Sequence, residues 1–123
     1  MIHLDTSFLS RALVPGSAEG KALLGWMRAG DPIALSAVAW AEFACGPVLL
    51  AVAEHGRTLF GEPVPFDGAH AERAAVLFNA SGRRRGSLAD CMVAAVAVRE
   101  DAVLATVNKG DVRRFSAVGL TLV

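Results

Sequence analysis

Three carboxylates stand alone in apolar parts of the sequence. Glu42 is the only charged residue within positions 37–45, Asp90 is the only one within positions 88–98, and Asp5 ends the first short stretch of the chain. An unpaired carboxylate costs several kcal/mol when it is buried, so each of these acids needs a cation or strong hydrogen-bond donors. One bound metal ion would compensate all three charges, which makes Asp5, Glu42 and Asp90 the candidate ligands.

The candidate ligands are all carboxylate oxygens, and this donor type indicates Mg²⁺ or Mn²⁺ rather than Zn²⁺. The three histidines show no paired spacing, and the two cysteines do not form the CxxC pattern of a zinc site. A hard cation of this kind activates water and neutralises the charge that develops on a phosphodiester. The residues therefore predict metal-assisted hydrolysis of a phosphate ester.

Each acid also has a purely structural alternative. Asp5 is placed to cap the helix that follows it, and Glu42 could pair with one of the arginines at 83–85. Capping and pairing explain the acids one at a time, but they do not explain why acids recur at strand ends and inside apolar helices. Two further pairs have the spacing of a capping box: Ser87 with Asp90, and Asn108 with Asp111.

The segments that must position these acids alternate between strand and helix. This alternation predicts an α/β fold, one domain over residues 1–123, with a mostly parallel central sheet of about four to five strands flanked by helices. The carboxyl ends of parallel strands meet at one edge, which is where Asp5, Thr106 and Asn108 are expected. Strands are expected at 2–4, 33–35, 63–66, 102–106 and 120–123, and helices at 8–13, 17–29, 36–45, 48–59, 68–80 and 87–100, with a helical turn from 108.

Composition limits the possible partners. The 123 residues suffice for one hydrophobic core, and the formal net charge of zero argues against coating nucleic acid by bulk charge. A local phosphate-binding patch remains open, because Arg83, Arg84 and Arg85 are consecutive. No apolar run approaches the roughly 20 residues that cross a bilayer, and the start lacks a basic signal-peptide region. We therefore expect a cytoplasmic protein without a membrane partner, with Cys45 and Cys91 reduced and buried.

Four segments occur in a characteristic order: 2–7 with Asp5-Thr6-Ser7, 34–43 with Glu42, 88–95 with Asp90, and 104–111. Each is unspecific alone, but their order, their spacing and the total length resemble PIN-domain nucleases, especially VapC-type toxins of toxin–antitoxin pairs. The resemblance covers nearly the whole chain. In the fourth segment Val112 follows Asp111, where such toxins often have Phe, so either Asp111 or Asn108 completes the site.

The resemblance implies a function as well as a fold. It implies a metal-dependent endoribonuclease that binds Mg²⁺ or Mn²⁺, forms homodimers, and is inhibited by a cognate antitoxin whose tail blocks the site. Hydrolysis would proceed by attack of a metal-activated water on the RNA. The implied catalytic residues are Asp5, Glu42, Asp90 and Asp111, with Asp5 and Asp90 as principal metal ligands and Glu42 beside them. Thr6, Thr106 and Asn108 would support the site. From their charge, and not from the resemblance, we expect Arg83, Arg84 and Arg85 to hold the RNA backbone.

Three other functions remain open from the sequence. The chain could be a catalytically silent PIN-like module that binds RNA, a phosphohydrolase of small phosphoesters, or a structural α/β domain whose acids are only caps and ion pairs. The sequence does not name an RNA target, so transfer, ribosomal and messenger RNA all remain candidates.

Overall fold

The computed structural model describes residues 1–46, 50–82, 88–112 and 121–123, with positions 50, 111 and 112 described by their backbone only. Strands and helices alternate along these residues as the sequence predicts. The elements are β1 (Ile2–Leu4), α1 (Thr6–Ala12), α2 (Ala18–Ala29), β2 (Ile33–Ala34), α3 (Ala37–Cys45), α4 (Leu50–Phe60), α5 (Gly68–Ala80), α6 (Leu88–Arg99), β3 (Val103–Ala105), α7 (Lys109–Val112) and β4 (Thr121–Leu122).

The described strands form one parallel sheet with the order β2-β1-β3-β4. Its centre is the β1–β3 pair, in which Ile2 lies opposite Val103 and Leu4 lies opposite Ala105. The pairing continues one residue further, because the Asp5 amide donates to the Ala105 carbonyl at 2.9 Å. The predicted α/β fold with a parallel central sheet is confirmed, and the ends of β1 and β3 lie side by side.

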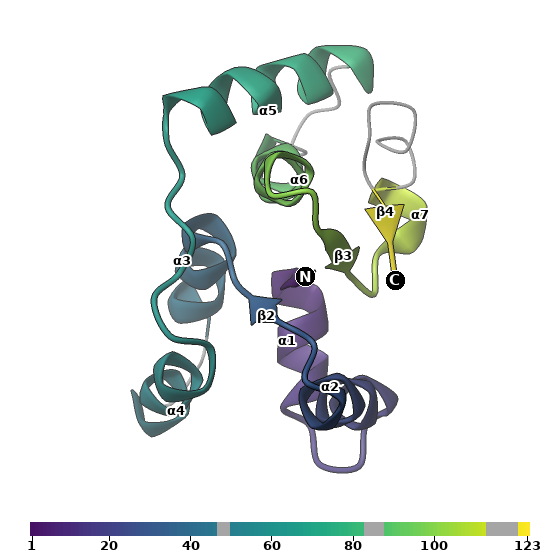
Figure 1. Cartoon of the computed structure of the whole chain (residues 1–123). Coiled ribbons are helices and arrows are strands. Elements are labelled where there is room, and N and C mark those ends of the chain that lie inside the picture. The colour runs from purple at the N-terminus through teal and green to yellow at the C-terminus, as the bar shows by residue number, and fades with distance from the viewer. Residues whose placement is uncertain (47–49, 83–87, 113–120) are drawn as a thin grey trace.

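Helices cover both faces of the sheet (Figure 1). In this view α1 and α2 lie below the strands, while α6 lies above them with α5 packed on its outer side. Helix α6 is the most deeply buried, since every residue from Val93 to Ala97 is at most 3% exposed. Its small side chains allow the sheet and α5 to approach closely. Among the described residues, no helix combines the length and the apolar character needed to cross a membrane.

Side-chain caps start the helices where the sequence predicts. The Ser17 hydroxyl accepts a hydrogen bond from the Gly20 amide, and the Ser36 hydroxyl accepts one from the Ala39 amide, each at 3.0 Å. Both satisfy amide groups that have no partner within the helix. Helix α2 ends at Gly30, whose φ of 80° is readily adopted by glycine. The helix beginnings are therefore encoded locally.

The expectations for the segment 63–66 and for Cys45 are wrong. The segment 63–66 forms no strand: only Val64 pairs, donating to the Leu35 carbonyl and accepting from the Ala37 amide, each at 2.8 Å. Pro63 and Pro65 on either side have no amide hydrogen, so the ladder cannot extend. Cys91 is buried as predicted, but Cys45 is exposed, because it lies in the last turn of α3.

Candidate functional site

Asp5 lies at the carboxyl end of β1 and caps α1. Its carboxylate accepts hydrogen bonds from the Thr6 amide at 2.8 Å, the Ser7 hydroxyl at 3.0 Å and the Thr106 hydroxyl at 2.7 Å. The residue is only 7% exposed. The capping role considered for Asp5 is thus real, but the two hydroxyl donors exceed what a cap requires and hold the carboxylate in one orientation.

Thr106 joins the end of β3 to this carboxylate. Besides donating to Asp5, its hydroxyl accepts a hydrogen bond from the Asn108 amide at 3.1 Å. Asn108 therefore contributes its backbone, while its side chain is exposed. Helix α7 follows directly, and its backbone includes Asp111. The segment 104–111 therefore reaches the edge of the sheet where Asp5 lies.

Ser7 is a contributor that the sequence analysis missed. Its hydroxyl donates to Asp5 Oδ2, lies 3.2 Å from the Thr106 hydroxyl, and accepts from the Val107 amide at 3.4 Å. A signal was available, because a hydroxyl two residues after an aspartate can return to its carboxylate. The sequence stretch Asp5-Thr6-Ser7 thus provides the acid and a hydroxyl that orients it.

Glu42 approaches the same edge from α3. The Thr6 hydroxyl lies 3.3 Å from Glu42 Oε1 and 3.1 Å from the Ala39 carbonyl, so α1 and α3 meet at these atoms. The expectation that Glu42 is buried is wrong, since α3 turns Ala39 and Phe43 into the core and leaves Glu42 exposed. A helix that looks apolar on every side can still have one face that no neighbouring element covers.

The carboxyl group of Glu42 lies within the electrostatic influence of the other two acids. Loss of water around its carboxyl group raises the pKa of Glu42, and the negative charges of Asp5 and Asp90 raise it further. The hydrogen bond from Thr6 opposes these effects. Asp90 itself is half-buried in the first turn of α6. Acids from β1, α3 and α6 therefore influence one another, although they are far apart in sequence.

This cluster is negative and rich in oxygen donors. Neither Asp5 nor Glu42 forms an ion pair with any described residue, and their polar contacts come from hydroxyl and amide groups. Accumulated carboxylates of this kind attract a hard divalent cation. Within the described ranges, no three acidic, histidine or cysteine side chains are grouped tightly enough to hold one ion together.

Several predicted residues fall outside the part of the chain that can be described. Arg83, Arg84 and Arg85 lie outside the described ranges, as does Ser87 of the suggested capping box. The side chain of Asp111 is likewise outside the description, although its backbone belongs to α7. The expected roles of these residues therefore remain predictions.

Comparison with solved structures gives the same fold. The chain is similar to FitAcB from Neisseria gonorrhoeae, with 27% identity, a TM-score of 0.74, and coverage of 99% of this chain and 96% of that one. It is also similar to VapBC2 from Rickettsia felis bound to a promoter DNA fragment, with 20% identity, a TM-score of 0.78, and coverage of 100% of this chain and 98% of that one. A toxin–antitoxin complex from Klebsiella pneumoniae matches as well, with 21% identity, a TM-score of 0.74, and coverage of 91% of this chain and 90% of that one. No curated protein matches the chain.

The sequence model of the PIN domain matches residues 2–118, which is nearly the whole chain. The matched range includes all four segments whose order indicated this family, and the parallel sheet agrees with the solved structures. The chain therefore belongs to the PIN domain family.

Proposed function

We propose that this protein is a metal-dependent endoribonuclease and the toxin of a toxin–antitoxin pair. The observation that carries the proposal is the acidic edge formed by Asp5 and Glu42, both in contact with α1, where the charges of Asp5 and Asp90 add to the loss of water in raising the pKa of Glu42. Ligands of parallel α/β sheets collect at this edge. Membership of the PIN domain family supports the same assignment.

The proposed ion is Mg²⁺ or Mn²⁺, with Asp5 and Asp90 as principal ligands and Glu42 beside them. Mg²⁺ commonly uses one or two carboxylates and keeps several waters, so a site of this kind does not need three protein ligands close together. Such an ion supplies an activated water and positive charge for the phosphate. The donor type and the negative charge of the cluster fit this ion.

The chain's own residues would prepare the site. Thr106 and Ser7 keep the Asp5 carboxylate turned toward the edge, and Thr6 positions Glu42. Removing a hydrogen-bond partner that orients a metal ligand lowers the rate of catalysis. We propose that Asp111 or Asn108 completes the site and that Arg83, Arg84 and Arg85 hold the RNA backbone by their positive charge.

A cognate antitoxin and a second copy of the chain are the proposed protein partners. The similar solved structures support the first, since one is a toxin–antitoxin complex and another is VapBC2 on promoter DNA. Co-expression with the protein encoded beside this chain should relieve growth arrest. Light scattering of the purified chain should give twice the monomer mass of 12.8 kDa.

The direct test is cleavage of RNA by the purified chain. Wild type should cut RNA with Mg²⁺ or Mn²⁺ and stop with EDTA. Asp5→Asn and Asp90→Asn should each lower the rate by more than about 100-fold, since outer-shell partners alone cost ~10–100-fold. Asp31→Asn is the matched control, because Asp31 is exposed in the turn before β2. Equal rates in all four proteins would reject the assignment.

Other outcomes identify the rival functions. RNA binding without cleavage, unaffected by metal, would indicate a catalytically silent RNA-binding module. Turnover of a nucleoside monophosphate without RNA cleavage would indicate a phosphohydrolase of small esters. Induced expression of wild type beside Asp5→Asn, with sequencing of new RNA 5′ ends, tests the toxin role: arrest with wild type alone is expected, and the new ends identify the target.

A further inference from the structure

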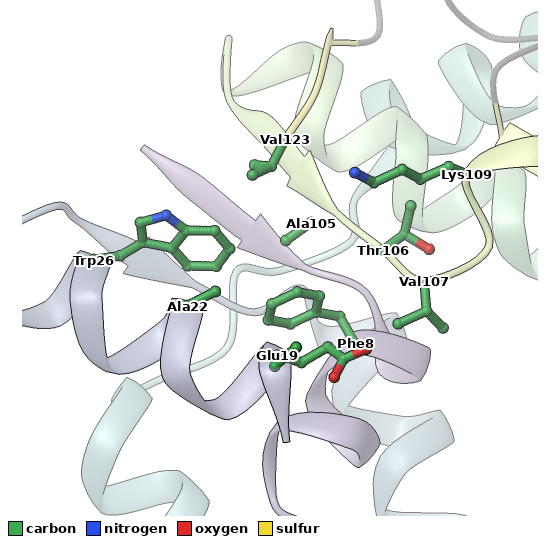
Figure 2. A pocket seen from close by; sticks show the side chains of 10 residues that line it. Phe8, Glu19, Ala22, Trp26, Ala105, Thr106, Val107, Lys109 and Val123 are labelled. Carbon is green, nitrogen blue, oxygen red and sulfur yellow. The ribbon is translucent and has the colours of Figure 1, made fainter. Parts of the chain in front are cut away.

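A cavity of about 370 Å³ opens beside the acidic site. It lies between α1 and α2 on one side and the end of β3 on the other (Figure 2). Thr106, whose hydroxyl donates to Asp5, forms part of its wall. A group bound in this cavity would therefore lie next to the proposed point of cleavage.

An aromatic pair forms the apolar side of the cavity. The rings of Phe8 and Trp26 are stacked with their centroids 5.4 Å apart and an interplanar angle of 24°. Phe8 is buried while Trp26 is only half-buried, so Trp26 is the ring with accessible surface. Aromatic side chains near a nucleic acid stack on its bases, because every base has a planar π-face.

Two opposite charges lie at different sides of the same cavity. Figure 2 shows Glu19, from α2, and Lys109, beyond the end of β3, both beside it. Neither side chain makes a hydrogen bond or ion pair with another residue of the described ranges. An ammonium group is a suitable contact for phosphate, and a carboxylate accepts hydrogen bonds from the amino group of a base.

We propose that this cavity receives one nucleobase next to the cleaved phosphate, with Trp26 stacking on the base, Glu19 accepting from its amino group and Lys109 contacting the phosphate. The proposal rests on the proposed ribonuclease function. The combination of ring, carboxylate and ammonium favours a nucleotide over an apolar peptide, which would leave both charges without a partner. Adenine, cytosine and guanine each carry an exocyclic amino group and uracil does not, so uridine is disfavoured at this position.

The two tryptophans allow binding to be measured without cleavage. Trp40 lies on α3 and does not line the cavity. The guanidinium carbon of Arg57, on α4, is 6.0 Å from the centroid of its ring. Trp40→Phe leaves Trp26 as the only reporter, and Trp26→Phe leaves Trp40. In EDTA, tetraribonucleotides of A or C should quench Trp26 fluorescence with roughly tenfold higher affinity than those of U. They should leave Trp40 fluorescence unchanged.

Variants of the two charged residues separate their roles. In the Trp40→Phe protein, Glu19→Ala should remove the preference for A and C over U. Lys109→Ala should lower the affinity for all oligonucleotides to a similar extent. Glu72→Ala on α5 is the control, since Glu72 is exposed and does not line the cavity. With metal, mapped cleavage ends should show depletion of U at one fixed position beside the cut, and Glu19→Ala should abolish that depletion.

The outcomes distinguish this proposal from the function on which it rests. Cleavage of RNA with no Trp26 quenching and an unchanged preference in Glu19→Ala would overturn the base site and leave the nuclease standing. Base-selective quenching without any cleavage would support the base site and reject the nuclease. If Trp26 fluorescence changes on binding of a co-expressed partner protein but not with any oligonucleotide, the proposal would also be overturned and the cavity assigned to a peptide.

Discussion

The hydroxyl of Thr106 donates a hydrogen bond to Oδ2 of Asp5 across 101 residues of sequence, with 2.7 Å between the two oxygens. A hydroxyl–carboxylate bond of this length is charge-assisted and stronger than a neutral one. It joins the carboxyl ends of the two central strands, β1 and β3. The orientation of the proposed ligand Asp5 thus depends on β3, a strand that lies about 100 residues later in the sequence.

Thr106→Val should slow RNA cleavage by about 10–100-fold, because it removes the donor that orients Asp5 while keeping the side-chain shape. Thr106→Ser retains the hydroxyl and should keep most of the activity. Single-turnover rates at saturating Mg²⁺ measure the effect, and thermal midpoints show whether both variants remain folded. Equal rates for the Val and Ser variants would show that this hydrogen bond does not matter to catalysis.

Glu42→Gln should raise the thermal midpoint of the metal-free protein at pH 7 and leave it nearly unchanged near pH 4. Although Glu42 is exposed as a residue, partial loss of water around its carboxyl group raises its pKa above the ordinary value of 4.5, and the charges of Asp5 and Asp90 raise it further. The folded state therefore binds more protons than the unfolded chain just above pH 4.5, and stability falls as the pH rises through this window. Melting in EDTA is the measurement.

Glu54→Gln is the control for Glu42→Gln, because Glu54 is exposed on α4. The control should change the midpoint little at either pH. A Glu42→Gln protein that melts at the wild-type temperature at pH 7 would mean that Glu42 carries no electrostatic cost in the folded state.

His3→Leu should increase the free energy of unfolding and flatten its pH dependence. His3 is 1% exposed, and neither ring nitrogen has a hydrogen-bond partner among the described residues. Burial lowers the pKa of His3; Glu100 opposes this, and the N-terminal amino group and His70 add to it. An unsatisfied buried polar group costs about 1–3 kcal/mol, so an apolar residue of similar size should gain about 1 kcal/mol.

The sign of the His3 effect follows from proton linkage. The unfolded chain takes up a proton near pH 6.5, whereas the lowered pKa of His3 makes the folded state bind that proton only at a lower pH, so wild type loses stability as the pH falls below about 6.5. Urea unfolding at pH 7.5, 6.5 and 5.5 measures the slope. His55→Gln is the control, because His55 is exposed on α4; the same slope in wild type and His3→Leu would contradict the assignment.

Two glycines of helix α2 should respond to alanine in opposite directions. A Cβ at Gly20 would lie 2.7 Å from the Ala12 carbonyl oxygen and 3.0 Å from the Ser17 hydroxyl, whereas a Cβ at Gly25 meets nothing within 4 Å. Gly25→Ala should therefore stabilise by roughly 0.5–1 kcal/mol. Gly20→Ala should destabilise by about 1 kcal/mol or more, because the backbone of α1 has to move.

Thermal or urea unfolding of the two glycine variants gives a direct comparison, with a shift of roughly 4 °C expected for each kcal/mol in a chain of this size. A stabilised Gly20→Ala protein would mean that α1 and α2 pack less closely than described. No change in Gly25→Ala would mean that helix propensity at this exposed position is offset elsewhere.

The sequence by itself determined the order of the elements and the start of most helices. Caps such as Ser17 and Ser36 act on amides three residues away, so their effect is readable from neighbouring residues. The alternation of strand and helix was enough to predict a parallel sheet, because crossovers between adjacent strands leave few other arrangements. Proximity of Asp5 and Thr106 followed from the same rule.

Only the tertiary structure decided which faces are covered and which side chains meet. Glu42 and Cys45 lie in an apolar helix, yet both are exposed, because burial depends on the elements that pack around α3 and not on its own residues. The hydrogen bonds of Ser7 with Thr106 and Val107 likewise join positions about 100 residues apart. Local chemistry specifies where chains turn and begin helices, whereas exposure and long-range contacts are properties of the packed molecule.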